Sequence, residues 1–246
     1  MTYCVGMRLD RGLVFMADTR TNAGVDNVFT FRKMFNWSKP GERVITILTA
    51  GNLATTQAVV SLLSERMKAP EDRSPSILEV PTMFQVAKLV GDTLKETVQS
   101  QSGNGPVADS TFSATLIVGG QIAGSEPRLF LVYPEGNFIE ASDENPFFQI
   151  GETKYGRPIL LRGYDPAMSF EDAVRILCLS FDSTLKANLS VGMPLDLMTY
   201  EKDSFRVGRE RRIESDDLAF NALSDAWGQA LKTAIHSLPP YAFDDD

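Results

Sequence analysis

The order of apolar patterns along this chain limits its fold to very few architectures. Short runs typical of β-strands form two blocks, one over about residues 2–51 and one over 111–151. Each block is followed by two segments in which apolar residues recur at helical spacing. Because a sheet must bury its apolar face, strand blocks that alternate with helix pairs predict two stacked sheets, each covered outside by helices. We therefore expect a four-layer αββα sandwich, an α+β fold, with residues 1–246 as one domain.

The first block begins with a predicted hairpin. Residues 2–9 and 13–18 are apolar, and the three residues between them form a turn signal. Residues 19–27 are polar and predict a loop, and an aromatic strand that carries Lys33 is expected over 28–37.

The remaining elements follow from the same patterns. A β-branched run that ends at Gly51 is typical of a strand buried on both faces, and Asn52 is suited to cap the next helix. Further helices and strands are expected at these positions: helix 52–69, helix 83–98, strands 111–118, 128–133 and 147–151, helices 154–162 and 169–185, strands 196–201 and 204–213, and helix 217–238. In the last helix, the apolar residues at helical spacing are expected to face a core: Phe220, Leu223, Trp227 and Leu231.

Charge and composition exclude several classes of partner. A net charge of −8 and a pI of about 4.8 argue against nucleic acid, which binds clustered Lys and Arg. The one basic cluster, residues 206–212, is expected to be the solvated face of a strand. No apolar run is long enough to span a membrane and no signal sequence is evident, so we expect a cytoplasmic protein with a disordered acidic tail at about 240–246.

Cysteine and histidine are too scarce for a disulfide framework or a histidine-rich metal site. Cys4 and Cys178 are far apart in sequence and predict small core residues, and His236 is the only histidine. A lone histidine near the end of a helix is suited to interact with the helix dipole. We expect no metal and no organic cofactor.

Thr2 is the strongest chemical candidate. Removal of Met1 would expose it as a free amino terminus, so that one residue carries both a nucleophilic Oγ and a basic α-amine. An α-amine has a reference pKa of about 7.7–8, so a useful fraction is neutral near pH 7.

Several stretches of the sequence together resemble the proteasome β subunits, which are N-terminal-nucleophile hydrolases. The resemblance runs nearly end to end and is greatest to the bacterial branch called Anbu, the ancestral β subunit. It is carried by these stretches: MTYCVGMRL, FMADTRTNAGVD, FRKMFNW, LTAGNLATTQ and SVGMPLDL.

The resemblance implies catalytic roles for four residues. Thr2 would be the nucleophile, Asp18 the buried carboxylate, Lys33 the lysine beside the threonine, and Gly51 the oxyanion donor. A nearby ammonium favours a deprotonated nucleophile and an unprotonated amine, which supports the role given to Lys33. Taken singly, Asp18 also fits a turn, Lys33 a solvated strand position, and Gly51 the end of a strand.

The sequence departs from the family pattern at the accessory positions. Family members have a Ser-Gly-Ser segment where this chain reads IGETKYG, which places Glu152 at a serine position. They also have an Asp three residues before a Ser-Gly pair, whereas ANLSVG offers Ala187 or Asn188 before Ser190. Both changes could slow catalysis or require a partner.

The resemblance also implies a substrate-binding region and a mode of assembly. Thr21 and Asn22 would hold an extended peptide, and Thr49 would form the base of the first specificity pocket. We expect a threonine peptidase that acts on peptides or unfolded proteins and self-associates into a ring or an open lock-washer, with any unfoldase partner unknown. The alternatives are a small-molecule amide hydrolase on the same fold and a catalytically silent scaffold.

Overall fold

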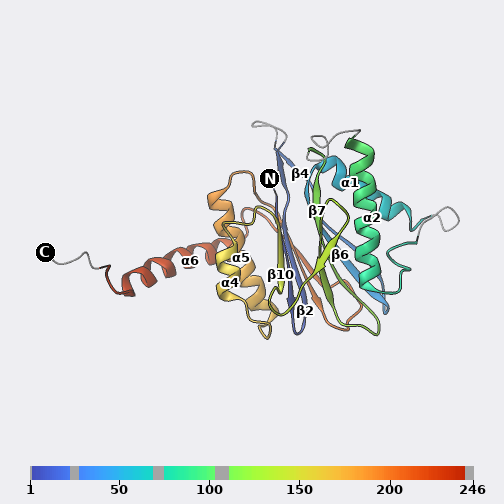
Figure 1. The fold of residues 1–246 in the computed structure, drawn as a ribbon. Helices are drawn as coiled ribbons and strands as arrows, with labels where there is room; N and C mark the ends of the chain where they lie inside the picture. Colours follow the sequence, from blue (N-terminus) through green and yellow to red (C-terminus); the bar gives the residue numbers. More distant parts are fainter. Residues whose placement is uncertain (1, 23–27, 69–74, 103–110, 242–246) are drawn as a thin grey trace.

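The computed structural model describes residues 2–22, 28–68, 75–102 and 111–241, and the predicted four-layer sandwich is confirmed (Figure 1). The first sheet contains, in spatial order, β10 (Phe147–Gly151), β1 (Tyr3–Leu9), β2 (Gly12–Asp18), β11 (Leu195–Glu201) and β12 (Arg209–Ile213). The second contains β5 (Met34–Lys39), β6 (Arg43–Gly51), β7 (Ala114–Ile122), β8 (Arg128–Val132) and β9 (Phe138–Glu140). A separate ribbon pairs β3 (Arg20–Asn22) with β4 (Val28–Thr30).

Helices cover the outer face of each sheet. Those of the second sheet are α1 (Leu53–Glu65) and α2 (Met83–Ser102), and those of the first sheet are α4 (Arg157–Gly163) and α5 (Phe170–Ala187) (Figure 1). A further helix, α6 (Leu218–Ser237), starts beside α5 and extends away from the body of the molecule (Figure 1).

Three apolar clusters fill the spaces between these layers. The middle cluster lies between the two sheets and includes Phe15 of β2, Leu48 of β6 and Ile117 of β7, all fully buried. The outer clusters lie under α1 and α2 on one side and under α4 and α5 on the other. Both cysteines are buried and free, Cys4 in the middle cluster and Cys178 on the inward face of α5 in the outer cluster, as expected for core residues.

The strand predicted over 28–37 is wrong in one important respect. It is two strands, β4 and β5, and Lys33 lies between them rather than within a strand. The break arises because β4 pairs with β3, in a segment predicted as a loop, whereas β5 joins β6 in the second sheet. The change of partner lets the Lys33 side chain leave the sheet.

Other differences also come from tertiary contacts. The strand expected over 111–118 continues through Gly119 in β7, where an added Cβ would be 2.6 Å from the Phe15 ring of the facing sheet. The short strand β9 was not predicted, and β12 begins only at Arg209. The expectation that Leu231 of α6 faces a core is wrong, because 42% of its surface is exposed. The acidic tail predicted at about 240–246 lies, from residue 242 onward, outside the described residues.

Candidate active site

Thr2 immediately precedes β1 and is held by contacts with the end of β10. Its side chain is 8% exposed, and its carbonyl oxygen accepts a hydrogen bond of 2.6 Å from the Glu152 N–H. Gly151 pairs with Tyr3 in the sheet at a φ of +82°, and a Cβ at Gly151 would lie 2.0 Å from the Thr2 carbonyl oxygen. Only glycine allows β10 to approach Thr2 this closely.

The Tyr3 side chain fixes the start of β1, next to Thr2. Its hydroxyl bonds to Ser180 Oγ at 2.7 Å and accepts from Gln149 at 2.7 Å, while its ring centroid lies 4.4 Å from that of Phe181. Burial raises the pKa of Tyr3 to about 12, so the phenol remains neutral at physiological pH. The first residue of β1, which directly follows Thr2, is therefore anchored in the core.

A buried ion pair lies beside Thr2. Lys33 Nζ donates to Asp18 Oδ1 at 2.7 Å and to the Arg20 carbonyl oxygen at 2.6 Å, and Lys33 is 4% exposed. Asp18 is fully buried at the end of β2 and also accepts from the backbone N–H of Tyr3 at 2.9 Å and of Gly192 at 3.3 Å.

Burial and these partners act in opposite directions on Asp18. Burial raises the pKa of the Asp18 carboxyl above its ordinary value, while the Lys33 ammonium and the two backbone N–H donors act against the rise. A buried carboxylate can persist only with such compensation. The charge of Asp18 thus depends on Lys33 and on the two backbone N–H donors.

Five of the predicted residues line one cavity of about 410 Å³: Thr2, Thr21, Lys33, Thr49 and Gly51. Ala50, Leu53 and Thr56 also contribute to its wall. Its volume lies within the range of small-molecule and peptide pockets.

Gly51 and Thr49 approach the cavity from β6. The N–H of Thr49 donates to the Lys33 carbonyl oxygen at 2.9 Å, which joins the end of β6 to the segment that carries Lys33. Gly51 has a φ of +114° and precedes Asn52, whose side chain accepts from the Thr55 N–H and caps α1. Gly51 therefore lies at the positive end of a helix dipole, where a negative charge is favoured.

Thr21 and Asn22 lie on the β3–β4 ribbon. Thr21 pairs with Phe29 in the ribbon, and its buried Oγ1 has no hydrogen-bond partner within the part of the chain that the structure describes. Asn22 pairs with Val28 in the same ribbon.

The accessory residues form a network of their own. Glu152 is 8% exposed, and its carboxylate accepts from the Lys154 N–H at 2.9 Å and from Asn188 Nδ2 at 3.0 Å. The side-chain Oδ1 of Asn188 in turn accepts from the Ser190 N–H at 2.9 Å. Glu152, Asn188 and Ser190, the three accessory residues named from the sequence, are thus joined by hydrogen bonds.

Comparisons with known proteins agree with the fold and with the arrangement of these residues. The family model described as proteasome subunit matches residues 2–198. The chain belongs to the proteasome subunit family. A curated relative, the proteasome subunit beta of Methanopyrus kandleri, is 24% identical over 87% of this chain and 93% of its own length.

Solved structures of this family extend the likeness over the whole chain. Anbu from Yersinia bercovieri is 44% identical with a TM-score of 0.92, covering 99% of this chain and 100% of its own. A structure described as the helical assembly of the Anbu complex from Pseudomonas aeruginosa is 45% identical with a TM-score of 0.92, covering 100% of both chains. The resemblance to the Anbu branch is confirmed.

Some residues of this proteasome-family site were not predicted from the sequence. Gly151 supports Thr2, and the N–H of Gly192 helps to hold Asp18. Gly151 lies in the stretch IGETKYG and Gly192 in SVGMPLDL, and this position within family-like stretches was the only indication of their importance. Within the described ranges, no group of three or more His, Cys, Asp and Glu is arranged to hold a metal ion, and no helix is long and apolar enough to cross a membrane.

Proposed function

We propose that this chain is a threonine peptidase whose nucleophile is Thr2 after removal of Met1. The observation that carries the proposal is the buried Lys33–Asp18 ion pair, whose lysine lines the same cavity as Thr2 and Gly51. An ammonium that is 4% exposed favours the deprotonated forms of the groups beside it.

The proposed reaction uses groups of this chain alone. The Thr2 Oγ attacks the peptide carbonyl carbon while its proton passes to the α-amine, and the resulting oxyanion accepts a hydrogen bond from the Gly51 N–H. The C–N bond then breaks, the α-amine returns the proton to the leaving amine, and an ester remains on Thr2. Water, deprotonated by the same amine, hydrolyses the ester and regenerates the hydroxyl.

The cavity favours an extended, uncharged substrate residue. Thr49 at its base is 4% exposed and small, and Leu53 and Thr56 add no charge to the wall. Thr21 lines the cavity from the β3–β4 ribbon, along which an extended peptide could pair as an added strand. We expect cleavage after small or medium-sized uncharged residues, and slower cleavage after acidic or basic ones.

We also propose that the chain self-associates. The support is its likeness over its full length to a chain whose structure is described as a helical assembly. An arrangement of identical subunits with head-to-tail contacts gives a ring when it closes and a helix when it does not.

Hydrolysis of a series of fluorogenic peptides tests the reaction. Thr2→Ala should abolish turnover, and Thr2→Ser, which keeps both the hydroxyl and the amine, should retain part of it. Mass spectrometry of each variant must establish that Met1 is absent. If Thr2→Ala hydrolyses peptides as fast as the parent, the proposed nucleophile is wrong.

A further inference from the structure

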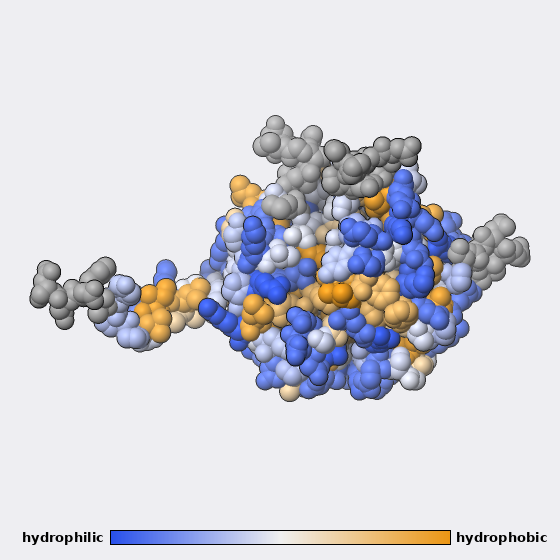
Figure 2. Space-filling view, viewed as in Figure 1, coloured by the Kyte–Doolittle hydropathy of each residue, from blue (hydrophilic) through white to orange (hydrophobic). Residues whose placement is uncertain are grey.

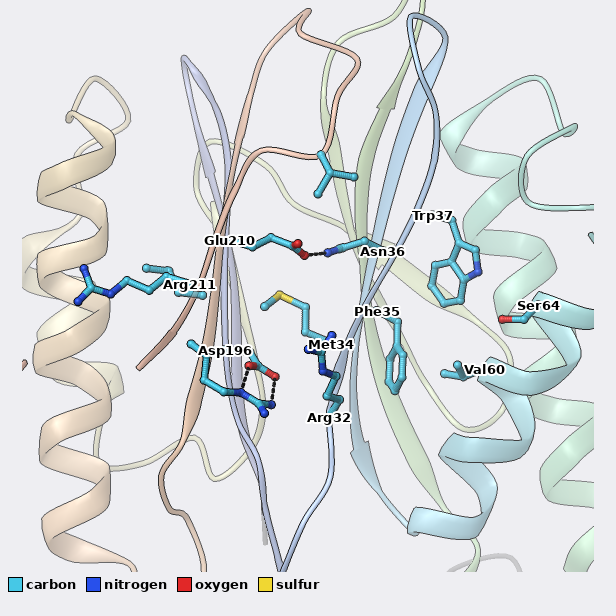
Figure 3. A pocket seen from close by; sticks show the side chains of 13 residues that line it. Arg32, Met34, Phe35, Asn36, Trp37, Val60, Ser64, Asp196, Glu210 and Arg211 are labelled. Carbon is cyan, nitrogen blue, oxygen red and sulfur yellow. Dashed lines mark hydrogen bonds and ion pairs between the residues drawn. The ribbon is translucent and has the colours of Figure 1, made fainter. Parts of the chain in front are cut away.

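A cavity of about 620 Å³ lies along the free edge of β5, on the open side of the sandwich (Figure 3). Within the described residues, β5 pairs with β6 alone, and residues of β12, the edge strand of the other sheet, line the opposite side. Arg32 and Met34 line this cavity and flank Lys33 in the sequence, yet it has no lining residue in common with the cavity that contains Thr2. We call it the edge cavity.

The backbone of β5 presents unpaired groups to this cavity. The Thr49 N–H donates to the Lys33 carbonyl oxygen, so these two residues form a hydrogen-bonded pair at the start of the ladder between β5 and β6. Hydrogen-bonded and non-hydrogen-bonded pairs alternate in an antiparallel ladder. The N–H and C=O groups of Met34 and Asn36 therefore point to the free edge, where an added strand can pair with them.

The side chains of β5 divide the edge cavity into an apolar half and a polar half. Phe35 and Trp37 point towards α1, where Val60 completes an apolar wall (Figure 3). Met34 and Asn36 point to the opposite side, towards β12 (Figure 3). Because successive side chains of an extended chain also point to opposite sides, a peptide paired with β5 would place alternate residues against the apolar wall.

Three of the charged side chains that line the edge cavity are paired. Arg212 donates to Asp196 at 2.8 Å and 3.1 Å. Arg211 points away from the cavity and pairs with Asp217 (Figure 3). These pairs therefore contribute little net charge to the cavity.

Arg32 and Glu210 are the charged lining residues without an ion pair in the part of the chain that the structure describes. Arg32 lies at the start of β5, whereas Glu210 accepts a hydrogen bond from Asn36, further along the strand (Figure 3). At about 3.3 Å per residue, positions 32 and 36 of the chain are about 13 Å apart. The edge cavity thus has a positive charge towards one end and a negative charge towards the other.

A short peptide with free ends has the matching polarity. If it runs antiparallel to β5, its carboxyl terminus lies beside the start of β5, where the Arg32 guanidinium offers two N–H donors in the geometry of a carboxylate. Its ammonium then lies towards Glu210, and about three to four extended residues span the interval. The proposed peptidase reaction releases fragments with just such a new carboxylate or a new amine.

We propose that the edge cavity binds a short peptide product with free ends, extended and antiparallel to β5, with its carboxylate on Arg32 and its ammonium on Glu210. The choice of ligand rests on the proposed function, because such peptides are the products of that reaction. The bound peptide adds a strand to the second sheet beside Arg32 and Met34, and so adjoins the segment that carries Lys33.

Titration of the peptide Ala-Val-Ala-Leu into a double variant, Thr2→Ala with Trp227→Phe, tests the site without hydrolysis. The chain has two tryptophans, and Trp227 belongs to α6, which projects from the body (Figure 2), so Trp37 of the cavity wall becomes the only one. We expect the peptide to change the fluorescence of Trp37, and calorimetry to give the same dissociation constant. Binding heat without any change in the Trp37 fluorescence would place the peptide elsewhere and overturn the proposal.

Changes at the ends of the peptide test the two charges. Amidation of its carboxyl group should weaken binding to the double variant about 5-fold to 10-fold, and adding Arg32→Ala should weaken binding of the acid equally but leave that of the amide unchanged. Acetylation of the peptide amine and Glu210→Gln, which keeps an acceptor for Asn36, should behave in the same way at the other end. Arg162→Ala, which alters an exposed arginine of α4, is the matched control and should leave every one of these affinities unchanged. If Arg32→Ala weakens the acid and the amide by the same factor, Arg32 does not bind the carboxylate.

Two N-methylated peptides test the strand pairing. A methyl group on the amide nitrogen of the second or of the third residue removes one N–H donor, and only one of these two donors faces β5 in an extended peptide. One isomer should therefore bind at least about 10-fold more weakly than the other. Equal binding of the two isomers would overturn the pairing with β5.

The outcomes separate this inference from the catalytic proposal. If the parent chain hydrolyses peptides but the double variant binds none at millimolar concentration, the edge site is wrong and the peptidase proposal stands. If the parent chain hydrolyses no peptide but the double variant binds with the expected dependence on Arg32 and Glu210, the peptide site stands and the peptidase proposal is wrong.

Discussion

Gly151→Ala offers a sharp test of how the strand β10 positions Thr2. The added Cβ would lie 2.0 Å from the Thr2 carbonyl oxygen, so the two strands must separate by about 1 Å to reach even a tight contact of 3.0 Å. The hydrogen bond of 2.6 Å from the Glu152 N–H to the same oxygen would be strained or broken. A misplacement of about 1 Å at a reacting group costs about 100-fold in rate, so we expect a loss of that size.

Gly124→Ala is the matched control for this variant. Gly124 has a φ of +83°, against +82° for Gly151, but a Cβ at Gly124 meets no atom within 4 Å. Both variants should lose about 1–2 kcal/mol of stability from the left-handed backbone, and only Gly151→Ala should lose activity. Peptide hydrolysis is compared per chain that lacks Met1, as counted by mass spectrometry. If the Gly151→Ala variant retains more than half of the parent rate, the close packing of β10 does not position the nucleophile.

Three further predictions concern the ion pair and the core. Lys33→Met should lower peptide hydrolysis at least 100-fold, and Lys39→Met, which alters a lysine whose side chain is 60% exposed, should leave it unchanged. Because burial raises the pKa of Asp18, acid should protonate it at a higher pH than an exposed aspartate, and activity should fall. The folded protein binds that proton more tightly than the unfolded chain does, so protonation of Asp18 does not itself unfold the protein, and circular dichroism should persist while activity falls. Loss of both signals at one pH would contradict this. Gly119→Ala should lower the free energy of unfolding in urea by about 1–3 kcal/mol through overpacking, because its Cβ would lie 2.6 Å from a ring carbon of Phe15. Gly228→Ala, with open space around its Cβ, should not be destabilising.

The layer order of the fold could be predicted because it depends on local patterns. The turn between β1 and β2, the β-branched run of β6 and the capping residue of α1 each specify their element without help from distant residues. The break at Lys33 could not be predicted, because it depends on the pairing of β4 with β3 and of β5 with β6. Periodicity along α6 showed an apolar face but not what covers it.

The candidate site divides in the same way. Thr2, Asp18, Lys33 and Gly51 could be named because their side chains, or the lack of one, carry the chemistry. The structure brings Thr2, Lys33 and Gly51 to one cavity, with Asp18 bonded to Lys33, whereas their catalytic roles remain predictions. The contributions of Gly151 and Gly192 are backbone contacts from distant segments, and a sequence pattern does not record which backbone groups meet.

The mass of the protein after exposure to a peptide epoxyketone tests the central claim most directly, because the reagent forms a stable adduct only when Oγ and a free α-amine belong to one residue. We predict that every chain that lacks Met1 gains one inhibitor mass, that peptide mapping places it on Thr2, and that Thr2→Ala gains none. A parent preparation that lacks Met1 and hydrolyses peptides, yet gains no inhibitor mass at Thr2, would contradict the account.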